Sequence, residues 1–299
     1  MGWAGKLMRV DLDAGRCVSE PLNREWAEQY LGQRGLATKY LTSEINPKVD
    51  ALAPGNKLIF ATGPLTDTMA ATGGRYSVVT KGALTDAIAC SNSGGKFGGE
   101  LKSAGWDMII VEGRAASPVY LFIEDDQVKL LPADDLWGRS VWDIEPAIQA
   151  RHGIPSVKVA SIGRAGEAMA RYACIMNDLD RAAGRSGVGA VMGSKNLKAV
   201  AVRGTVGVSS HDPQAFMTAV KAGRAKLDPH PSRKRLGANG THAMLDIMQN
   251  FGGLPTRNNQ AVQFDGVGKI NAAAVKVPRA SDGRPNLVST RACFACTIA

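Results

Sequence analysis

The sequence is short of cysteine and has no long apolar run, and each shortage excludes a class of protein. Five cysteines in 299 residues are too few for the disulfide framework of a secreted scaffold. No stretch of about 18 apolar residues is present, so no membrane-spanning helix is expected. The N-terminal apolar stretch is also too short for a secretory signal. Together these absences predict a cytoplasmic protein.

Common nucleotide and nucleic-acid signatures are also missing. No glycine-rich segment has clean Rossmann spacing, and none carries the P-loop lysine followed by serine or threonine. The formal net charge of +9 is compatible with a solvated basic surface, an anionic ligand or an acidic partner. Because no basic stretch is interleaved with aromatic residues and no recognition-helix pattern occurs, nucleic-acid binding is not expected.

Strand patterns dominate the first two thirds of the chain, and helical patterns begin after about residue 205. A glycine-interrupted helical pattern covers 25–40, and amphipathic patterns cover 140–151, 212–226 and 241–250. The segments with strand character are 6–12, 58–61, 76–80, 108–112, 119–123, 128–131, 157–161 and 199–203. We therefore predict an α+β fold with a β-rich domain at 1–208 and the beginning of a helical domain at 209–299.

Two glycine-rich segments of the first domain resemble each other. They cover 91–101 and 181–191, and each runs into a strand-like segment. At a constant shift of 91 residues, the matching pairs are Gly98 with Gly189, Val111 with Val202, and Gly113 with Gly204. Upstream, at another shift, Arg75-Tyr76 resembles Arg171-Tyr172. The pattern indicates a duplication in which each copy is strand, glycine-rich loop, short helix and strand.

A glycine-rich loop that opens a helix can direct several main-chain N–H groups at one anion, beside the positive end of the helix dipole. Two such loops therefore predict two phosphate groups, or one ligand with approximate two-fold symmetry. The alternative is a pair of tight turns that only pack a helix on a sheet.

Cys293 and Cys296 form a C-x-x-C pair near the end of the sequence. This spacing fits half of a zinc site, a redox dithiol or part of an iron–sulfur ligand set. None of the available histidines, His211, His230 and His242, has zinc-finger spacing to the pair. The remaining cysteines, interpreted as structural thiols, are Cys17, Cys90 and Cys174. Since half a metal site needs further ligands, we expect the chain to be part of a longer protein.

Several motifs spread along the whole chain form a set. They are GQRGLA at 32–37, GPLT at 63–66, TGGRY at 72–76, NSGG at 92–95, IMND at 175–178, RAAGR at 181–185, GVGAVMGSKNLKA at 187–199 and LPTRN at 254–258. With the cysteine pair, these motifs resemble the tungsten-containing aldehyde:ferredoxin oxidoreductase family. The run from Arg181 onward is the most specific of them.

The resemblance implies a duplicated, β-rich base for two pterin-dithiolene molecules, followed by helical domains. It implies an enzyme that oxidises small aldehydes to carboxylic acids at a tungsten bis-molybdopterin centre. Electrons would pass through a [4Fe-4S] cluster to ferredoxin or a ferredoxin-like subunit, in a homo- or hetero-oligomer. The alternatives are the tungsten subunit of a benzoyl-CoA-reductase-type enzyme, a cofactor-binding protein without turnover, and a zinc-stabilised basic nucleic-acid-binding protein.

The resemblance also implies roles for particular residues. Cys293 and Cys296 match the first two cluster ligands, and Arg75 matches an arginine between pterin and cluster. The main-chain carbonyls of Asn92 and Ala182 match ligands of a Mg²⁺ ion that bridges the two pterin phosphates. The full set of expected cofactor-binding residues is Arg75, Asn92, Gly94, Gly95, Arg181, Ala182, Gly184 and Arg185. The other cluster ligands and the catalytic acid–base residues are expected beyond residue 299.

Overall fold

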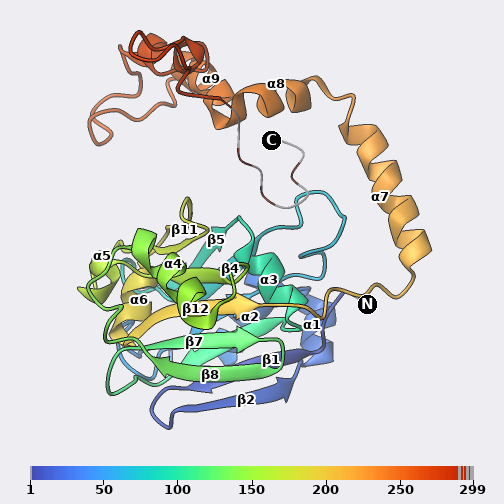
Figure 1. Ribbon diagram of the computed structural model, residues 1–299, viewed down its shortest axis with the longest axis vertical. Helices are drawn as coiled ribbons and strands as arrows, with labels where there is room; N and C mark the ends of the chain where they lie inside the picture. Colours follow the sequence, from blue (N-terminus) through green and yellow to red (C-terminus); the bar gives the residue numbers. More distant parts are fainter. Residues whose placement is uncertain (1, 289–290, 292, 294–295, 297–299) are drawn as a thin grey trace.

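Two six-stranded mixed sheets form the β-rich part of the molecule (Figure 1). The computed structural model describes residues 2–288, 291, 293 and 296. The first sheet has the order β2-β1-β6-β3-β4-β5 and the second β8-β7-β12-β9-β10-β11. The strands are β1 Lys6–Asp11, β2 Arg16–Pro21, β3 Leu58–Ala61, β4 Tyr76–Lys81, β5 Ile88–Ser93, β6 Met108–Glu112, β7 Val119–Glu124, β8 Gln127–Pro132, β9 Lys158–Ser161, β10 Ile175–Asn177, β11 Arg181–Ala183 and β12 Leu197–Arg203.

The two sheets repeat one topology, which confirms the duplication. Adding six to each strand number converts the first order into the second, and among the described strands the only parallel pairs are the equivalent β1–β6 and β7–β12. The predicted match of Arg75 with Arg171 within the repeat was wrong. Ala61 pairs with Ser77, whereas its counterpart Ser161 pairs with Met176. The register therefore makes Cys174, not Arg171, the counterpart of Arg75, because the connection before β10 differs in length from that before β4.

The core is layered, and strand periodicity assigns residues to its layers. On β6, Ile109 and Val111 face the core between the two sheets, whereas Met108 and Ile110 face the helices on the outer side. Between the sheets lie α3 Phe97–Ser103 and α6 Val188–Ser194. The outer face of the first sheet is covered by α1 Arg24–Tyr30 and α2 Gln33–Glu44, and that of the second by α4 Val141–His152. A short helix, α5 Arg164–Glu167, precedes β10.

Local signals explain where two of these helices begin and end. The side chain of Ser140 accepts a hydrogen bond from Trp142 N and begins α4, while Gly153, with φ of 66°, ends it. The pattern predicted at 25–40 is two helices, because Leu31 and Gly32 leave the helical conformation. The residues that precede α1 and α2 are Asn23 and Gly32, and both residue types are suited to the start of a helix.

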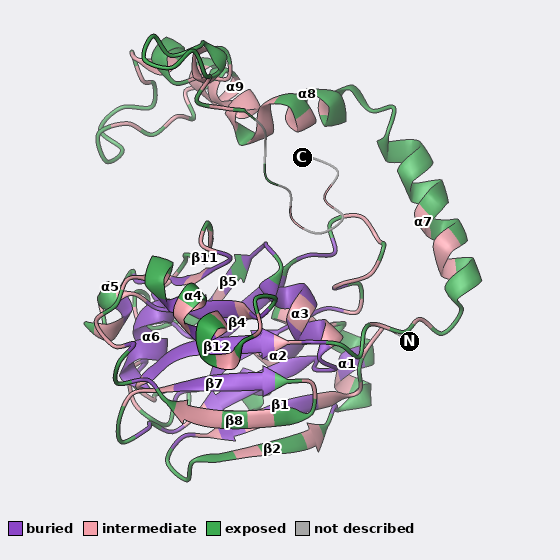
Figure 2. Cartoon of the chain, in the orientation of Figure 1, coloured by how far each residue is buried: buried purple, intermediate pink, exposed green. Residues whose placement is uncertain are grey.

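The C-terminal third is helical at first and extends away from the sheets (Figures 1 and 2). Its α-helices are α7 Pro213–Leu227, α8 Pro231–Asn239 and α9 Leu245–Asn250, and none contains a buried residue. The helix predicted at 241–250 begins as the 3-10 turn Gly240–Met244, a common form of a first turn. Further 3-10 turns are Val267–Lys269 and Ala274–Lys276. The boundary near 208 falls between β12 and α7 and stays a prediction.

Among the described helices, none is both long enough and apolar enough to cross a membrane.

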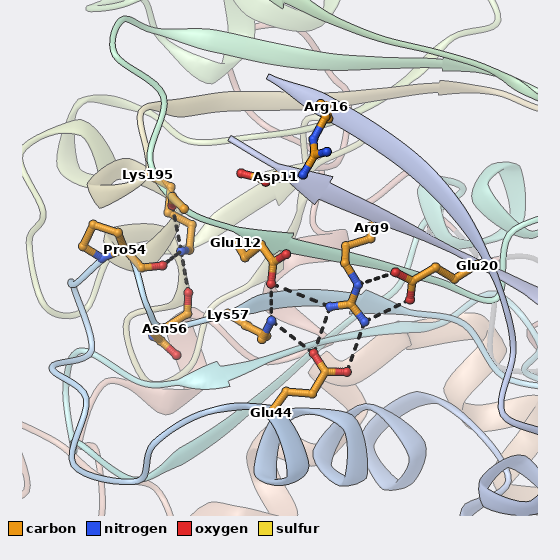
Figure 3. Close-up of polar contacts among 11 residues, drawn as sticks. Arg9, Asp11, Arg16, Glu20, Glu44, Pro54, Asn56, Lys57, Glu112 and Lys195 are labelled. Atoms are coloured by element: carbon orange, nitrogen blue, oxygen red, sulfur yellow. Dashed lines mark hydrogen bonds and ion pairs between the residues drawn. The ribbon is translucent and has the colours of Figure 1, made fainter. Parts of the chain in front are cut away.

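A charged network ties α2 to the edge of the first sheet (Figure 3). The Arg9 guanidinium on β1 donates to both oxygens of Glu20, at 2.8 and 3.1 Å, and to both oxygens of Glu44, at 2.9 and 3.1 Å. Lys57 lies 3.1 Å from Glu44 and pairs with Glu112. Partial burial by itself would raise the pKa of Glu44, but hydrogen bonds from Arg9 and Lys57 outweigh it and hold that pKa below its ordinary value.

A buried lysine joins the two copies of the duplication, which we call the first half and the second half. Lys195 follows α6, and its Nζ donates to the main-chain oxygens of Asn56 (2.5 Å), Gly113 (3.1 Å) and Pro54 (3.2 Å), all from the first half; Figure 3 shows two of these contacts. Burial lowers the pKa of Lys195 to about 8. The side chain therefore remains mainly protonated at pH 7, and its donors satisfy three carbonyl groups.

We expect Glu44→Gln to lower the free energy of unfolding at pH 7 by about 1 to 2 kcal/mol, because hydrogen bonds to charged partners are lost. The folded pKa of Glu44 is depressed, so its contribution is full above the unfolded pKa, roughly 4.3, and is lost as the pH falls through the folded pKa. Urea unfolding of the wild type and of Glu44→Gln, at pH 7 and at acidic pH, measures this difference in the free energy of unfolding. Glu28→Gln, at an exposed position of α1, is the control; an equal loss in both variants would contradict the role of the network.

Candidate functional site

The two glycine-rich loops lie together at the edges of the two sheets. They follow β5 and β11, which are the last strands of their sheets and contact each other (Figure 1). Asn92 pairs with Ser77, and Ala182 pairs with Met176. Since Ser77 and Met176 are themselves equivalent, Asn92 and Ala182 occupy the same place in the two copies. Both are exposed, and an edge strand leaves alternate main-chain groups outside the ladder.

A buried polar network holds the first loop against the second half. Asn177 Oδ1 accepts from Tyr76 Oη at 3.1 Å and from Ser93 Oγ at 2.7 Å, and Asn177 Nδ2 donates to Gly94 O at 2.9 Å. The main-chain N–H of Arg185, in the second loop, donates to Ser91 Oγ at 2.9 Å. The two loops are thus connected through side chains as well as through strand packing.

Several main-chain N–H groups at the starts of the two short helices have acceptors within the protein. The N–H groups of Lys96 and Phe97 donate to Asp178 Oδ2, at 2.7 and 3.3 Å. At α6, Gly189 N donates to Ala173 O at 2.9 Å. These three N–H groups are therefore already bound within the protein, and phosphate binding by the glycine-rich loops stays a prediction.

Arg75 directly precedes β4, and its side chain reaches the neighbouring edge strand β5. Its Nη1 donates to Asn92 Oδ1 at 2.6 Å. Its main-chain carbonyl accepts from Gln33 Nε2 at 2.8 Å and from Thr66 Oγ1 at 3.2 Å. The backbone is therefore held by two polar side chains while the exposed guanidinium projects beside Asn92.

The cysteine pair is brought to the same place by the end of the chain. Gly95 N donates to Cys293 Sγ at 3.1 Å, and Cys296 N donates to Cys293 O at 3.0 Å. A Cβ atom on Gly94 would lie 2.5 Å from Cys293 Sγ, so only glycine leaves room for the sulfur. Arg291 is held by β11 and the turn before it, because its carbonyl accepts from Arg181 Nη2 at 2.5 Å and its guanidinium pairs with Asp180 at 3.0 Å.

The other predicted positions are also located. Gly184 and Arg185 are exposed in the second loop, and Gly184 stands where Gly94 stands in the first. None of the five cysteines, all of them described, forms a disulfide. Within the described residues, no group of three or more His, Cys, Asp or Glu side chains could hold a metal ion, so His211, His230 and His242 do not complete a zinc site with the pair.

Sequence reasoning gave no role to Asn177 or Asp178, although it recognised the motif that contains them. Both are buried, with 1% and 6% of their surface exposed, and Asp178 has a positive φ of 49°. Adjacent Asn and Asp between two strand-like segments were the available signal, since these residues tolerate that conformation.

Comparison with known proteins decides which family these features belong to. The family model described as aldehyde ferredoxin oxidoreductase, N-terminal domain, matches residues 7–204, and the model for domains 2 and 3 of the same family matches residues 218–299. The chain belongs to the aldehyde ferredoxin oxidoreductase family. The resemblance inferred from the motifs is confirmed.

Relatives of this aldehyde ferredoxin oxidoreductase family member are similar along nearly all of its length. It is 46% identical to the tungsten-containing aldehyde ferredoxin oxidoreductase of Pyrococcus abyssi, over 99% of this chain and 48% of that protein. It is 45% identical to the protein of the same name from Thermococcus kodakarensis, over 98% of this chain and 48% of the relative. The chain therefore spans about half the length of the curated relatives it matches.

A solved structure of a related enzyme shares the fold. The active-site complex BamBC of benzoyl coenzyme A reductase, bound to 1,5-dienoyl-CoA, superposes with a TM-score of 0.82 at 31% identity. The match covers 99% of this chain and 46% of that chain. The α+β class and the duplicated sheets are thus those of a known enzyme fold.

We expect Gly94→Ala to displace Cys293, because the added methyl group would occupy the position of its sulfur. In full-length protein, iron retained against a chelator should fall about 10-fold or more, as for other changes beside metal ligands. The matched control is Gly184→Ala in the equivalent loop, where the nearest atom to the added Cβ lies at 3.8 Å. Equal iron retention in both variants would contradict the predicted placement of Cys293.

Proposed function

We propose that the whole protein oxidises small aldehydes to carboxylic acids at a tungsten bis-molybdopterin centre. The observation that carries this proposal is the meeting of two equivalent loops, one from each copy of the duplication, beside the cysteine pair. When bound, tungstopterin supplies the two-electron chemistry. The tasks left to this chain are to bind and orient the cofactor and to hold the cluster ligands close to it.

The donors of the two loops suit a ligand with two phosphate groups. Arg75 lies beside the first edge strand, Arg181 lies on β11, and Arg185 lies in the second loop. Guanidinium groups bind phosphate through paired N–H donors. Each copy therefore contributes cationic donors next to an exposed strand edge, as a ligand with approximate two-fold symmetry requires. Glycines at 94, 95 and 184 let such a ligand approach the backbone closely.

A magnesium ion between the two phosphates is part of the proposal. Its protein ligands would be the main-chain carbonyl oxygens of Asn92 and Ala182, and oxygen ligands are those that Mg²⁺ prefers. Support comes from the equivalent registers of the two residues on neighbouring edge strands.

Cys293 and Cys296 would provide the first two thiolate ligands of a [4Fe-4S] cluster. The placement of Cys293 against the first loop supports this assignment, because pterin and cluster must lie within a short electron-transfer distance. The remaining thiolates would come from outside the described residues.

A ferredoxin or a ferredoxin-like subunit is the proposed electron acceptor, and the cytoplasm the proposed location. The formal net charge of +9 suits an acidic partner. One relative, 38% identical over 216 residues, is named as the WOR-like subunit of an aliphatic sulfonate oxidoreductase from Pyrococcus furiosus, and the BamBC structure is a complex of subunits. These names favour an assembly with further subunits.

The second candidate is a ring reductase of the benzoyl-CoA type, which the shared fold favours. Identity to the aldehyde oxidoreductases, 45% to 46%, exceeds the 31% identity to the BamBC chain. We therefore prefer the aldehyde reaction, and substrate tests on one preparation separate the two.

The deciding experiment is metal analysis with an absorption spectrum on the anaerobically purified, full-length protein. We expect tungsten near one atom per chain and iron near four, as a rough value for a [4Fe-4S] centre, together with aldehyde-dependent reduction of ferredoxin. Cys293→Ser should lower the iron content, while Cys17→Ser on β2 should not. Bound zinc without a visible chromophore would overturn the proposal, and reduction of benzoyl-CoA without aldehyde oxidation would replace it by the second candidate.

Arg75→Ala should slow the appearance of reduced cluster after aldehyde is added more than it lowers the tungsten and pterin content. The reason is that the guanidinium can hold two acceptors at once, while Arg181 and Arg185 still provide cationic donors. Stopped-flow absorbance and metal analysis of the same preparation measure both quantities, with the exposed Arg16→Ala as control. Equal losses of rate and content would show that Arg75 only neutralises cofactor charge.

A further inference from the structure

The turn between β10 and β11 contacts both the first loop and the segment that carries Cys293. On one side, Asp178 Oδ2 accepts from Lys96 N and Phe97 N. On the other side, Asp180 pairs with the Arg291 guanidinium at 3.0 Å. One short turn of the second half therefore fixes two segments that are distant in sequence.

Gly95 lies between main-chain groups that are hydrogen-bonded by the side chains of Asn177 and Asp178. Asn177 Nδ2 binds the carbonyl of Gly94, before it, and Asp178 binds the N–H groups of Lys96 and Phe97, after it. The N–H of Gly95 itself is directed to Cys293 Sγ, at 3.1 Å. Its φ of +87° is a conformation that glycine adopts without strain.

The Asp178 carboxylate is itself held. Besides the two main-chain donors, Asp178 Oδ2 accepts from Asn177 Nδ2 at 2.7 Å, and Asn177 Oδ1 is bound by the hydroxyl groups of Tyr76 and Ser93. Charge-assisted hydrogen bonds of this kind are stronger than neutral ones, and a fully satisfied buried network is rigid. The Asp178 carboxylate is therefore held in one position, and the direction of the Gly95 N–H depends on that position.

We propose that Asp178 is a positioning residue that directs the Gly95 N–H onto the sulfur of Cys293, and that this hydrogen bond raises the reduction potential of the iron–sulfur cluster. Hydrogen bonds to cluster sulfurs are one determinant of that potential. A reduced cluster carries one more negative charge, so a donor aimed at its sulfur stabilises the reduced form more. The inference rests on the proposed function, because it takes Cys293 as a cluster ligand.

The test uses full-length, cluster-containing protein and the substitution Asp178→Gly, which removes the carboxylate but tolerates the positive φ. We expect iron and tungsten contents near those of the wild type and a lower cluster potential in an EPR-monitored redox titration. The shift of the Fe–S stretching bands on transfer to D₂O, a sign of an exchangeable N–H at sulfur, should also decrease. Asp178→Asn keeps an acceptor oxygen and should give intermediate values.

Asp125→Gly is the matched control. Asp125 has nearly the same φ, 50°, and also accepts a main-chain N–H, from Thr205 at 2.7 Å, but it lies in the β7–β8 hairpin. Its variant should keep the wild-type potential and D₂O shift.

The outcomes separate this inference from the proposed function. A wild-type potential and D₂O shift in Asp178→Gly overturn the inference alone. If Asp178→Gly loses its iron, Asp178→Asn decides, and wild-type values there overturn it. Wild-type protein that binds no iron contradicts the proposed function itself, and this inference with it.

Discussion

The close packing of the two sheets around α3 and α6 is the constraint on which the rest of the structure depends. Both helices are short and rich in glycine because they run between two sheets. A Cβ on Gly98 would lie 3.0 Å from the Cβ of Tyr76, so even an alanine would press on the strand beneath. The small helices let the edge strands β5 and β11 meet, and that contact brings the two loops to one place.

The loops are then fixed by polar groups in a dry environment. Tyr76, Ser93, Asn177 and Asp178 are all buried, and their hydrogen bonds cross from one half to the other. Because a buried polar group without a partner is costly, the network tolerates few alternative arrangements. The loops of the site are therefore part of the core that joins the two copies. The cysteine pair lies on the C-terminal segment, and Cys293 contacts this core from its outer side.

Much of this fold could be predicted from the sequence, because the long apolar strands carry their own periodicity. The segment at 108–112 coincides with β6, and the helical pattern at 140–151 agrees with α4 to within one residue at each end. The short edge strands β5 and β11 and the helix α3 were not predicted as elements with bounds. Serine and asparagine in β5 and glycine in α3 favour neither structure locally, and the Arg-Ala-Ala of β11 favours a helix over a strand. Tertiary contacts give these segments their structure.

The site was predictable in its members but not in its connections. Arg75 donates to Asn92, and Gly95 donates to Cys293, while the cofactor roles of these residues stay predictions. The role of Asp178 depends on a contact between residues 82 positions apart, which no local pattern encodes. The same contact gives the start of α3 an acceptor from the other copy.

Lys195 shows that the two copies are no longer interchangeable. At the shift of 91 that relates α3 to α6, its counterpart is Ala104, which is buried and apolar. The ammonium group of one copy satisfies three carbonyl groups of the other, and the reverse contact does not exist between these two positions. A domain assembled from two identical copies of the second half would bury two such lysines, yet nothing here would guarantee acceptors for both. The interface between the two copies is therefore asymmetric at this position.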